Sequence, residues 1–197
     1  MRFFILVTAV FVCGIHTCFG EIELITVKWA QGYCTKNCQE GLRTRLKSVP
    51  PIAEFNVQGE GSQVQIRWKP KAPFSYLTLN MIIKGFGIHI DQVFMRVRGV
   101  IERDARHTYL VSLGDNTRFI LLSPINVSPL QSQSVARNNV ESYQLAVNLK
   151  ERFLLDEQEY RVVTVQGNLF DPWRYVENYL IVQSASSPPP LVKPHVQ

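Results

Sequence analysis

Alternating hydrophobic and polar residues predict four strands in the first half of the chain. The alternation runs through residues 25–29, 55–57, 64–68 and 89–97, and a period of two is typical of strands with one buried face. The second and third runs flank Gly59-Glu60-Gly61. Because glycine favours tight turns, these two runs are expected to form a hairpin.

The segment between the first two strands predicts an amphipathic helix. Leu42, Leu46 and Val49 lie at i, i+4 and i+7, which places them on one helical face. Pro50 and Pro51 follow. They end the helix because proline lacks the amide proton and restricts the residue before it.

A second helix is predicted between the third and fourth strands. Phe74, Leu77 and Met81 supply its apolar face, and Gly85 ends it. The resulting order is strand, helix, strand, strand, helix, strand. This order predicts a ferredoxin-like sandwich over residues 21–95.

The second half, residues 96–183, has an all-β pattern apart from one ambiguous stretch. Its strand-forming runs cover residues 93–102, 109–113, 119–121, 162–165 and 179–182. The first run leaves the sandwich, so one long strand is expected to serve both halves. Residues 140–155 fit a strand or a helix and form an insertion between the third and fourth runs. Five strands with such an insertion favour an OB-like barrel, with another small barrel or sandwich as the alternative. The fold class is therefore α+β.

Aromatic residues in the second half have two interpretations. Tyr109, Phe119, Trp173 and Tyr175 either fill the core of the barrel or stack on a ligand, since OB folds bind oligonucleotides or sugars. Gly114-Asp115-Asn116 is expected to turn the chain between the runs at 109–113 and 119–121, which predicts a second hairpin. Asp104, Arg106 and His107 are expected to form a charged cluster with Asp115 across this hairpin.

The two ends of the chain predict export and a flexible tail. Residues 1–20 have a positive start, a short apolar run and a small-residue end, the three regions of a secretory signal peptide. Residues 184–197 are proline-rich and are expected to be disordered. The protein is therefore expected in the periplasm or outside the cell, with no membrane span once the signal is cleaved.

The positive charge is small and spread along the chain, which argues against nucleic acid as a partner. The formal net charge is +5 for the whole chain, and Arg2 is the only charged residue in the signal peptide. The longest basic grouping is Arg43, Arg45 and Lys47, which is expected to be the solvated face of the first helix.

The candidate chemistry lies in the loop between the first strand and the first helix. Cys34 and Cys38 are the cysteines that remain after signal cleavage. Two sulfurs at a strand-to-helix corner can hold a soft metal ion or form a disulfide.

This region resembles the heavy-metal-associated domain of copper chaperones and metal-transporting ATPases. With Gly32 on the family glycine, Cys38 falls on the second metal-binding cysteine, and Phe86 lies in the loop that packs beside the metal. The spacing is Cys-x-x-x-Cys, because Cys34 stands one residue earlier than the first family ligand. Tyr33 replaces the methionine that anchors the loop.

The resemblance implies binding or delivery of a monovalent copper-like ion. Cys34 and Cys38 would be the ligands, since monovalent copper accepts two thiolates. His89 is a possible third ligand, because it precedes the strand that ends near the loop. Gly32, Tyr33 and Phe86 would pack around the site, and the partner would be a metal donor or acceptor protein.

Two other functions use the same cysteines without a metal. A disulfide is natural in an oxidising compartment, and a bridge across so short a loop stabilises little. Lys36 would favour a thiolate and so a redox-active pair. The rivals are therefore a structural or partner-binding protein with the pair bridged or idle, and a small thiol redox factor. No residue pattern points to another catalytic activity, so the chain is not expected to be an enzyme.

Overall fold

The computed structural model describes residues 21–58, 62–125 and 139–187. The predicted signal peptide at 1–20, the turn expected at 59–61, residues 126–138 and the final residues 188–197 lie outside the described residues. The statements below refer to the described part of the chain.

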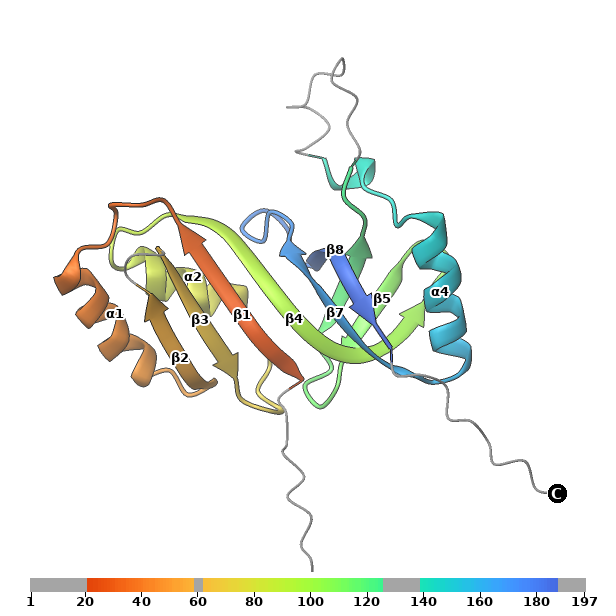
Figure 1. The fold of residues 1–197 in the computed structure, drawn as a ribbon, viewed down its shortest axis with the longest axis horizontal. Helices are drawn as coiled ribbons and strands as arrows, with labels where there is room; N and C mark the ends of the chain where they lie inside the picture. Colours follow the sequence, from red (N-terminus) through yellow and green to blue (C-terminus); the bar gives the residue numbers. More distant parts are fainter. Residues whose placement is uncertain (1–20, 59–61, 126–138, 188–197) are drawn as a thin grey trace, which may run out of the picture.

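The protein has a mixed α+β fold built mostly from strands (Figure 1). The elements in chain order are β1 (Ile22–Trp29), α1 (Lys36–Lys47), β2 (Ile52–Gln58), β3 (Gln63–Trp68), α2 (Tyr76–Lys84), β4 (Ile90–Arg103), β5 (Thr108–Ser112), β6 (Arg118–Leu122), the 3-10 turn η1 (Val140–Ser142), α4 (Val147–Gln158), β7 (Val162–Leu169) and β8 (Asn178–Ser186). The ambiguous stretch at 140–155 is thus helical.

The first half is a four-stranded antiparallel sheet in the order β2-β3-β1-β4. Helices α1 and α2 contact each other and pack against strands of this sheet. The predicted inward residues of β1 and α1 are confirmed: Ile25, Val27, Leu42 and Leu46 are all buried. The period-two and period-3.6 patterns therefore located this part of the core correctly.

The predicted apolar face of the second helix is wrong. Leu77 and Met81 are 63% and 61% exposed. The helix begins at Tyr76, because Ser75 caps it by accepting a hydrogen bond from the Thr78 amide at 3.2 Å. The face that packs on the sheet is instead the larger apolar stripe at i, i+3, i+6 and i+7, with these buried residues: Tyr76, Leu79, Ile82 and Ile83.

Strand β4 belongs to both halves, as the sequence predicted. It pairs with β1 from Ile90 to Val97 and with β7 from Phe94 to Val100. Figure 1 shows it as a long curved strand running from the first sheet into the second half. The boundary expected between residues 95 and 96 lies inside this strand.

The second half is a closed β-barrel. The strands follow the order β4-β5-β6-β8-β7, and β7 pairs back onto β4. Strands β6 and β8 are parallel, whereas the other neighbours are antiparallel. Helix α4 lies between β6 and β7 in the chain and packs on β4, with Phe153 fully buried.

Two glycines permit the strands of the barrel to approach closely. A Cβ atom at Gly99 would clash with the Val111 carbonyl oxygen, and one at Gly167 would clash with the Ile181 carbonyl oxygen. Glycine within a strand often marks such a close backbone approach. A side chain at either position would force the strands apart.

One aromatic residue ties the two halves together. Phe74 packs on Trp68 of the first sheet, at 5.6 Å between ring centroids, and on Phe119 of the barrel at 6.0 Å. Its backbone amide also donates to the Asp115 carboxylate at 3.3 Å. Most buried hydrophobic residues of both halves accordingly form one continuous core, and a small separate cluster in the barrel contains Ile120, Leu122 and Phe170.

The predicted start of the tail at residue 184 is too early. Strand β8 continues to Ser186, and its last residues pair with Thr164, Val165 and Gln166 of β7. The polar composition of this stretch suggested disorder, but the ladder with β7 satisfies its backbone groups. Among the described residues, no helix is long and apolar enough to cross a membrane.

Candidate functional site

The cysteine corner, residues 32–38, connects β1 to α1 at an exposed edge of the first half. Gly32 has a φ of +85°, a conformation that glycine adopts without steric cost. The chain then turns into α1, which begins at Lys36. This places Cys34 just before the helix and Cys38 in its first turn.

Cys34 and Cys38 are joined by a disulfide, with 5.3 Å between their Cα atoms. Both residues are partly buried and pack against the edge of the core. The bridge holds the two sulfurs side by side. The structure therefore brings together the two residues that the sequence singled out.

The start of α1 favours negative charge at Cys38. The helix has no acidic residue in its first turn and no side-chain cap at Thr35. The unpaired amides of a helix N-terminus carry partial positive charge, which stabilises a nearby thiolate. The Gln39 side chain donates to the Cys34 carbonyl oxygen at 3.3 Å and so fixes the loop on the helix.

Phe86 lies against α1 one turn after Cys38. A Cβ atom at Gly41 would be only 2.7 Å from the Phe86 ring, so the ring fills the space that a larger residue at 41 would occupy. Phe86 is partly buried against the core. The structure thus places Phe86 beside the first turns of α1.

Tyr33 does not anchor the loop as a buried methionine would. Its side chain is 62% exposed, and it leaves the outer side of the cysteine corner open to solvent. A reductant, an ion or a protein partner can therefore approach the corner from this side.

His89 is not gathered with the cysteines. It immediately precedes β4, whose first residue Ile90 pairs with Trp29 at the end of β1. Its side chain is 76% exposed, and its nearest charged group is the Asp91 carboxylate at 3.8 Å. Among the described residues, no three metal-ligating side chains come together.

The four aromatic residues predicted in the second half divide between core and surface. Phe119 is fully buried in the barrel. Tyr109 and Tyr175 are partly buried on the outside of the barrel, and Trp173 is 55% exposed. Only the last three could therefore meet a ligand.

Sequence reasoning missed three further aromatic residues on the same outer face. Tyr143, Phe170 and Tyr179 form a chain of ring contacts with Tyr175, with centroid separations of 4.7, 5.8 and 5.3 Å along the series. A signal was present, because β6 and β8 are apolar on consecutive positions rather than alternate ones. Such runs indicate strands that are covered on both faces.

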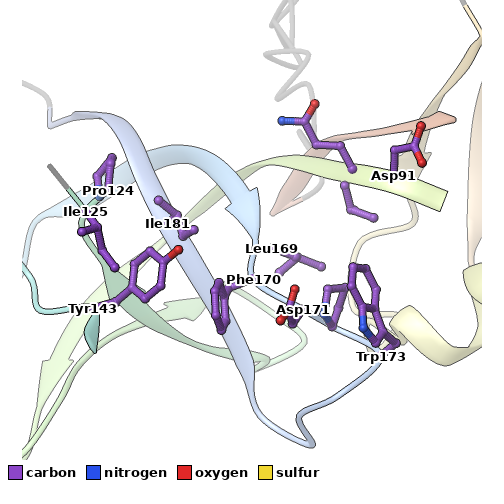
Figure 2. A pocket seen from close by; sticks show the side chains of 12 residues that line it. Asp91, Pro124, Ile125, Tyr143, Leu169, Phe170, Asp171, Trp173 and Ile181 are labelled. Atoms are coloured by element: carbon purple, nitrogen blue, oxygen red, sulfur yellow. The ribbon is translucent and has the colours of Figure 1, made fainter. Parts of the chain in front are cut away.

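The rings of Tyr143 and Phe170, together with that of Trp173, wall a cleft of about 350 Å³ between the β7–β8 connection and the start of β4. Figure 2 shows Tyr143, Phe170 and Trp173 in a row, with Asp171 beside Trp173 and Asp91 across the opening. We call this the aromatic cleft.

The expected charged cluster forms without Asp115. The Asp104 carboxylate accepts hydrogen bonds from the Tyr109 hydroxyl at 2.6 Å and from the amides of Arg106 and His107 at 2.7 and 2.6 Å. The Tyr109 bond, followed by the two amides, lowers the pKa of Asp104 to about 2. Asp115 lies at the opposite end of β5 and instead bonds Thr117. The cluster is a turn that orders the β4–β5 connection.

Comparison with known proteins found no family model, no curated protein and no solved structure that matches this chain.

Proposed function

We propose that this is an exported, non-catalytic protein whose cysteine pair alternates between a disulfide and a dithiol, and that the dithiol binds one soft ion such as monovalent copper. Cys34 and Cys38 would hold the ion. Export rests on the predicted signal peptide, and the partner would be a protein that donates or accepts the metal.

The observation that carries the proposal is the placement of the two sulfurs. They lie side by side, partly exposed, at the start of a helix that favours negative charge. Among the described residues no third ligand joins them. Two thiolates without a third ligand suit a soft monovalent ion better than zinc, which requires four ligands in structural sites.

Conversion between the two states is a balanced two-electron step. A reductant such as a dithiol supplies two electrons and two protons, the sulfur–sulfur bond breaks, and two thiols form while the reductant becomes a disulfide. The thiols lose their protons when they bind the ion, so binding depends on pH.

Strand order supports the ferredoxin-like part of the proposal. In the first half the order β2-β3-β1-β4, with every pair antiparallel, is compatible with a split β-α-β arrangement such as that of heavy-metal-associated domains. In the second half, a closed five-stranded barrel with a helix between its third and fourth strands favours an OB-like barrel. The names ferredoxin-like and OB-like rest on these two strand orders.

The test is a titration of the reduced mature protein with monovalent copper without oxygen, in competition with a coloured chelator. We expect one bound ion per chain. The disulfide form and the Cys34→Ser variant, which has one thiol, are expected to bind none in competition. Met81→Ala is a matched control, because it alters an exposed soft sulfur on α2 and should leave the stoichiometry unchanged.

The second candidate is a protein in which the bridge is permanent. It is favoured by the packing of both cysteines against the core, which would slow their reduction. In that case the mature protein would resist a glutathione-strength reductant and bind no copper after stronger reduction. Rapid and reversible reduction without copper binding would instead indicate a thiol redox factor.

A further inference from the structure

The aromatic cleft has the chemistry of a site for a proline-rich, basic peptide segment. Its walls are the rings of Tyr143, Phe170 and Trp173, and Trp173 is more than half exposed. The walls are preformed, since Phe170 is fixed between Tyr143 and Tyr175. Grooves lined by aromatic rings accept proline side chains, because the polyproline II conformation presents them with little loss of entropy.

The rim of the aromatic cleft is acidic, although the protein as a whole is basic. Asp91 and Asp171 both line the opening. Asp171 forms no ion pair with a residue in the described ranges. Asp91 pairs with His89, whose side chain is largely exposed. The basic group nearest in sequence, Arg174, lies over the Tyr175 ring at 5.7 Å. A basic occupant therefore fits better than an acidic one.

The loop that presents Trp173 is held in a defined shape. Asp171 has a φ of +35°, a rare conformation for a residue with a side chain. The Arg174 amide closes the turn by donating to the Asp171 carbonyl oxygen at 2.8 Å. Residues in such conformations tend to occur at ligand sites.

The chain carries a segment of matching chemistry directly after β8. Residues 188–197 read PPPLVKPHVQ, three prolines followed by two apolar residues and Lys193. A run of prolines favours polyproline II because each ring fixes φ. The prolines would pack on the rings while Lys193 meets the acidic rim.

The proline triplet of this segment, residues 188–190, cannot reach the cleft of its own chain. Two hydrogen bonds hold the end of β8 in place. The Ser187 hydroxyl donates to the buried Asp156 carboxylate at 3.2 Å, and the Ala185 carbonyl oxygen accepts from Arg152. The cleft residue Ile181 lies five positions before Ser186 along β8, or about 16 Å at the rise of a strand. The proline triplet ends four residues after Ser186 and so spans about 13 Å at most.

We propose that the aromatic cleft binds the proline-rich segment 188–197 of a second copy of this chain. Each copy then offers a cleft at one place and a segment at another. The contact is heterologous, so copies associate head to tail into a ring or an open chain. The proposal concerns the barrel and does not depend on the metal site.

The test measures self-association of the full mature chain by sedimentation at rising concentration. Trp173→Ala removes the cleft wall, and a second variant carries Pro188→Ala, Pro189→Ala and Pro190→Ala. Each is expected to weaken self-association by about tenfold or more. Leu77→Ala, a change at an equally exposed apolar residue on α2, is the control and should leave it unchanged.

Mixing the two defective chains gives the decisive result. The Trp173→Ala chain retains its segment and the triple-proline variant retains its cleft, so a mixture should form one-to-one pairs that neither forms alone. Asp171→Lys should weaken association, and Lys193→Asp in a second chain should restore it. The proposal is overturned if the wild-type chain stays monomeric up to about 1 mM, if either variant self-associates like the wild type, or if the mixture yields no pairs.

Discussion

The cysteine corner and the aromatic cleft present chemistry in different ways. The corner holds its two reactive atoms within five consecutive residues, at one strand-to-helix junction. The cleft assembles its rings from the segment after η1 and the β7–β8 connection, with the start of β4 on the opposite rim. The first site depends on local geometry, whereas the second depends on how the barrel closes.

This difference predicts which structural changes should damage each site. A local site tolerates moderate loss of global stability, because its loop and helix bring the sulfurs together. An assembled site loses its shape when strands shift. The cysteines pack against the core that runs through β4 and through the contact between Phe74 and Phe119. Phe170 of the cleft belongs to a separate small cluster on the barrel.

The largest effect is expected from Phe119→Ala. The ring is fully buried and contacts Phe74 across the two halves, and truncation of a buried phenylalanine costs about 3–5 kcal/mol. Urea unfolding should show one transition at a lower midpoint, reported equally by both halves. Leu77→Ala, on the surface, should change the free energy of unfolding by about 0.5 kcal/mol at most. Two separate transitions would show that the halves unfold independently.

Removal of the bridge should have a smaller effect on stability. Cys34→Ser with Cys38→Ser releases a loop of five residues, for which loop-closure entropy gives about 2 kcal/mol. Reduction of the wild-type protein should lower the urea midpoint by the same amount, while self-association through the aromatic cleft stays unchanged. A loss as large as that of Phe119→Ala would mean that the bridge supports the shared core.

Gly41→Ala should change stability by about 1 kcal/mol or less. Alanine improves helix propensity by about 1 kcal/mol, but its methyl group would displace the Phe86 ring. The clearer readout is the rate at which a small dithiol reduces the bridge. We expect both Gly41→Ala and Phe86→Ala to speed reduction, because the ring shields α1 beside Cys38. Unchanged rates in both variants would remove Phe86 from the site.

The smallest effect is a local one at acidic pH. The Tyr109 hydroxyl and two backbone amides hold the pKa of Asp104 at about 2 in the folded protein, below the usual value of about 3.9. A depressed pKa stabilises the turn above about pH 4, and that contribution is lost as the pH falls through about 2. NMR titration of the Asp104 carboxyl group should place its midpoint near 2, and Asp104→Asn should abolish the step. A midpoint near 4 would mean that these hydrogen bonds do not persist in solution.

Local patterns were enough to predict much of the fold. The burial of Ile25, Val27, Leu42 and Leu46 follows directly from their spacing. The shared strand and the β5–β6 hairpin were also predicted, because both are formed by neighbours in the chain. The face of α2 was not, since this helix carries apolar residues on more than one side, and only its packing on the sheet selects Leu79, Ile82 and Ile83 over Leu77 and Met81.

The two sites differ in predictability for the same physical reason. Cys34 and Cys38 stand in one loop, so their proximity follows from chain length alone. The rings of Tyr143 and Phe170 meet only because β6 pairs in parallel with β8 and the barrel closes. The consecutive apolar positions of β6 and β8 indicate only that these strands are covered on both faces, and they do not say which distant strands pair, so the aromatic cleft was not predicted.

The most direct test of the metal site is X-ray absorption at the copper edge on the reduced mature protein loaded with one equivalent of monovalent copper. The account predicts two sulfur ligands and no nitrogen ligand, because the described residues bring only Cys34 and Cys38 together. A nitrogen ligand that disappears in His89→Ala, or a protein that retains no copper, would contradict it.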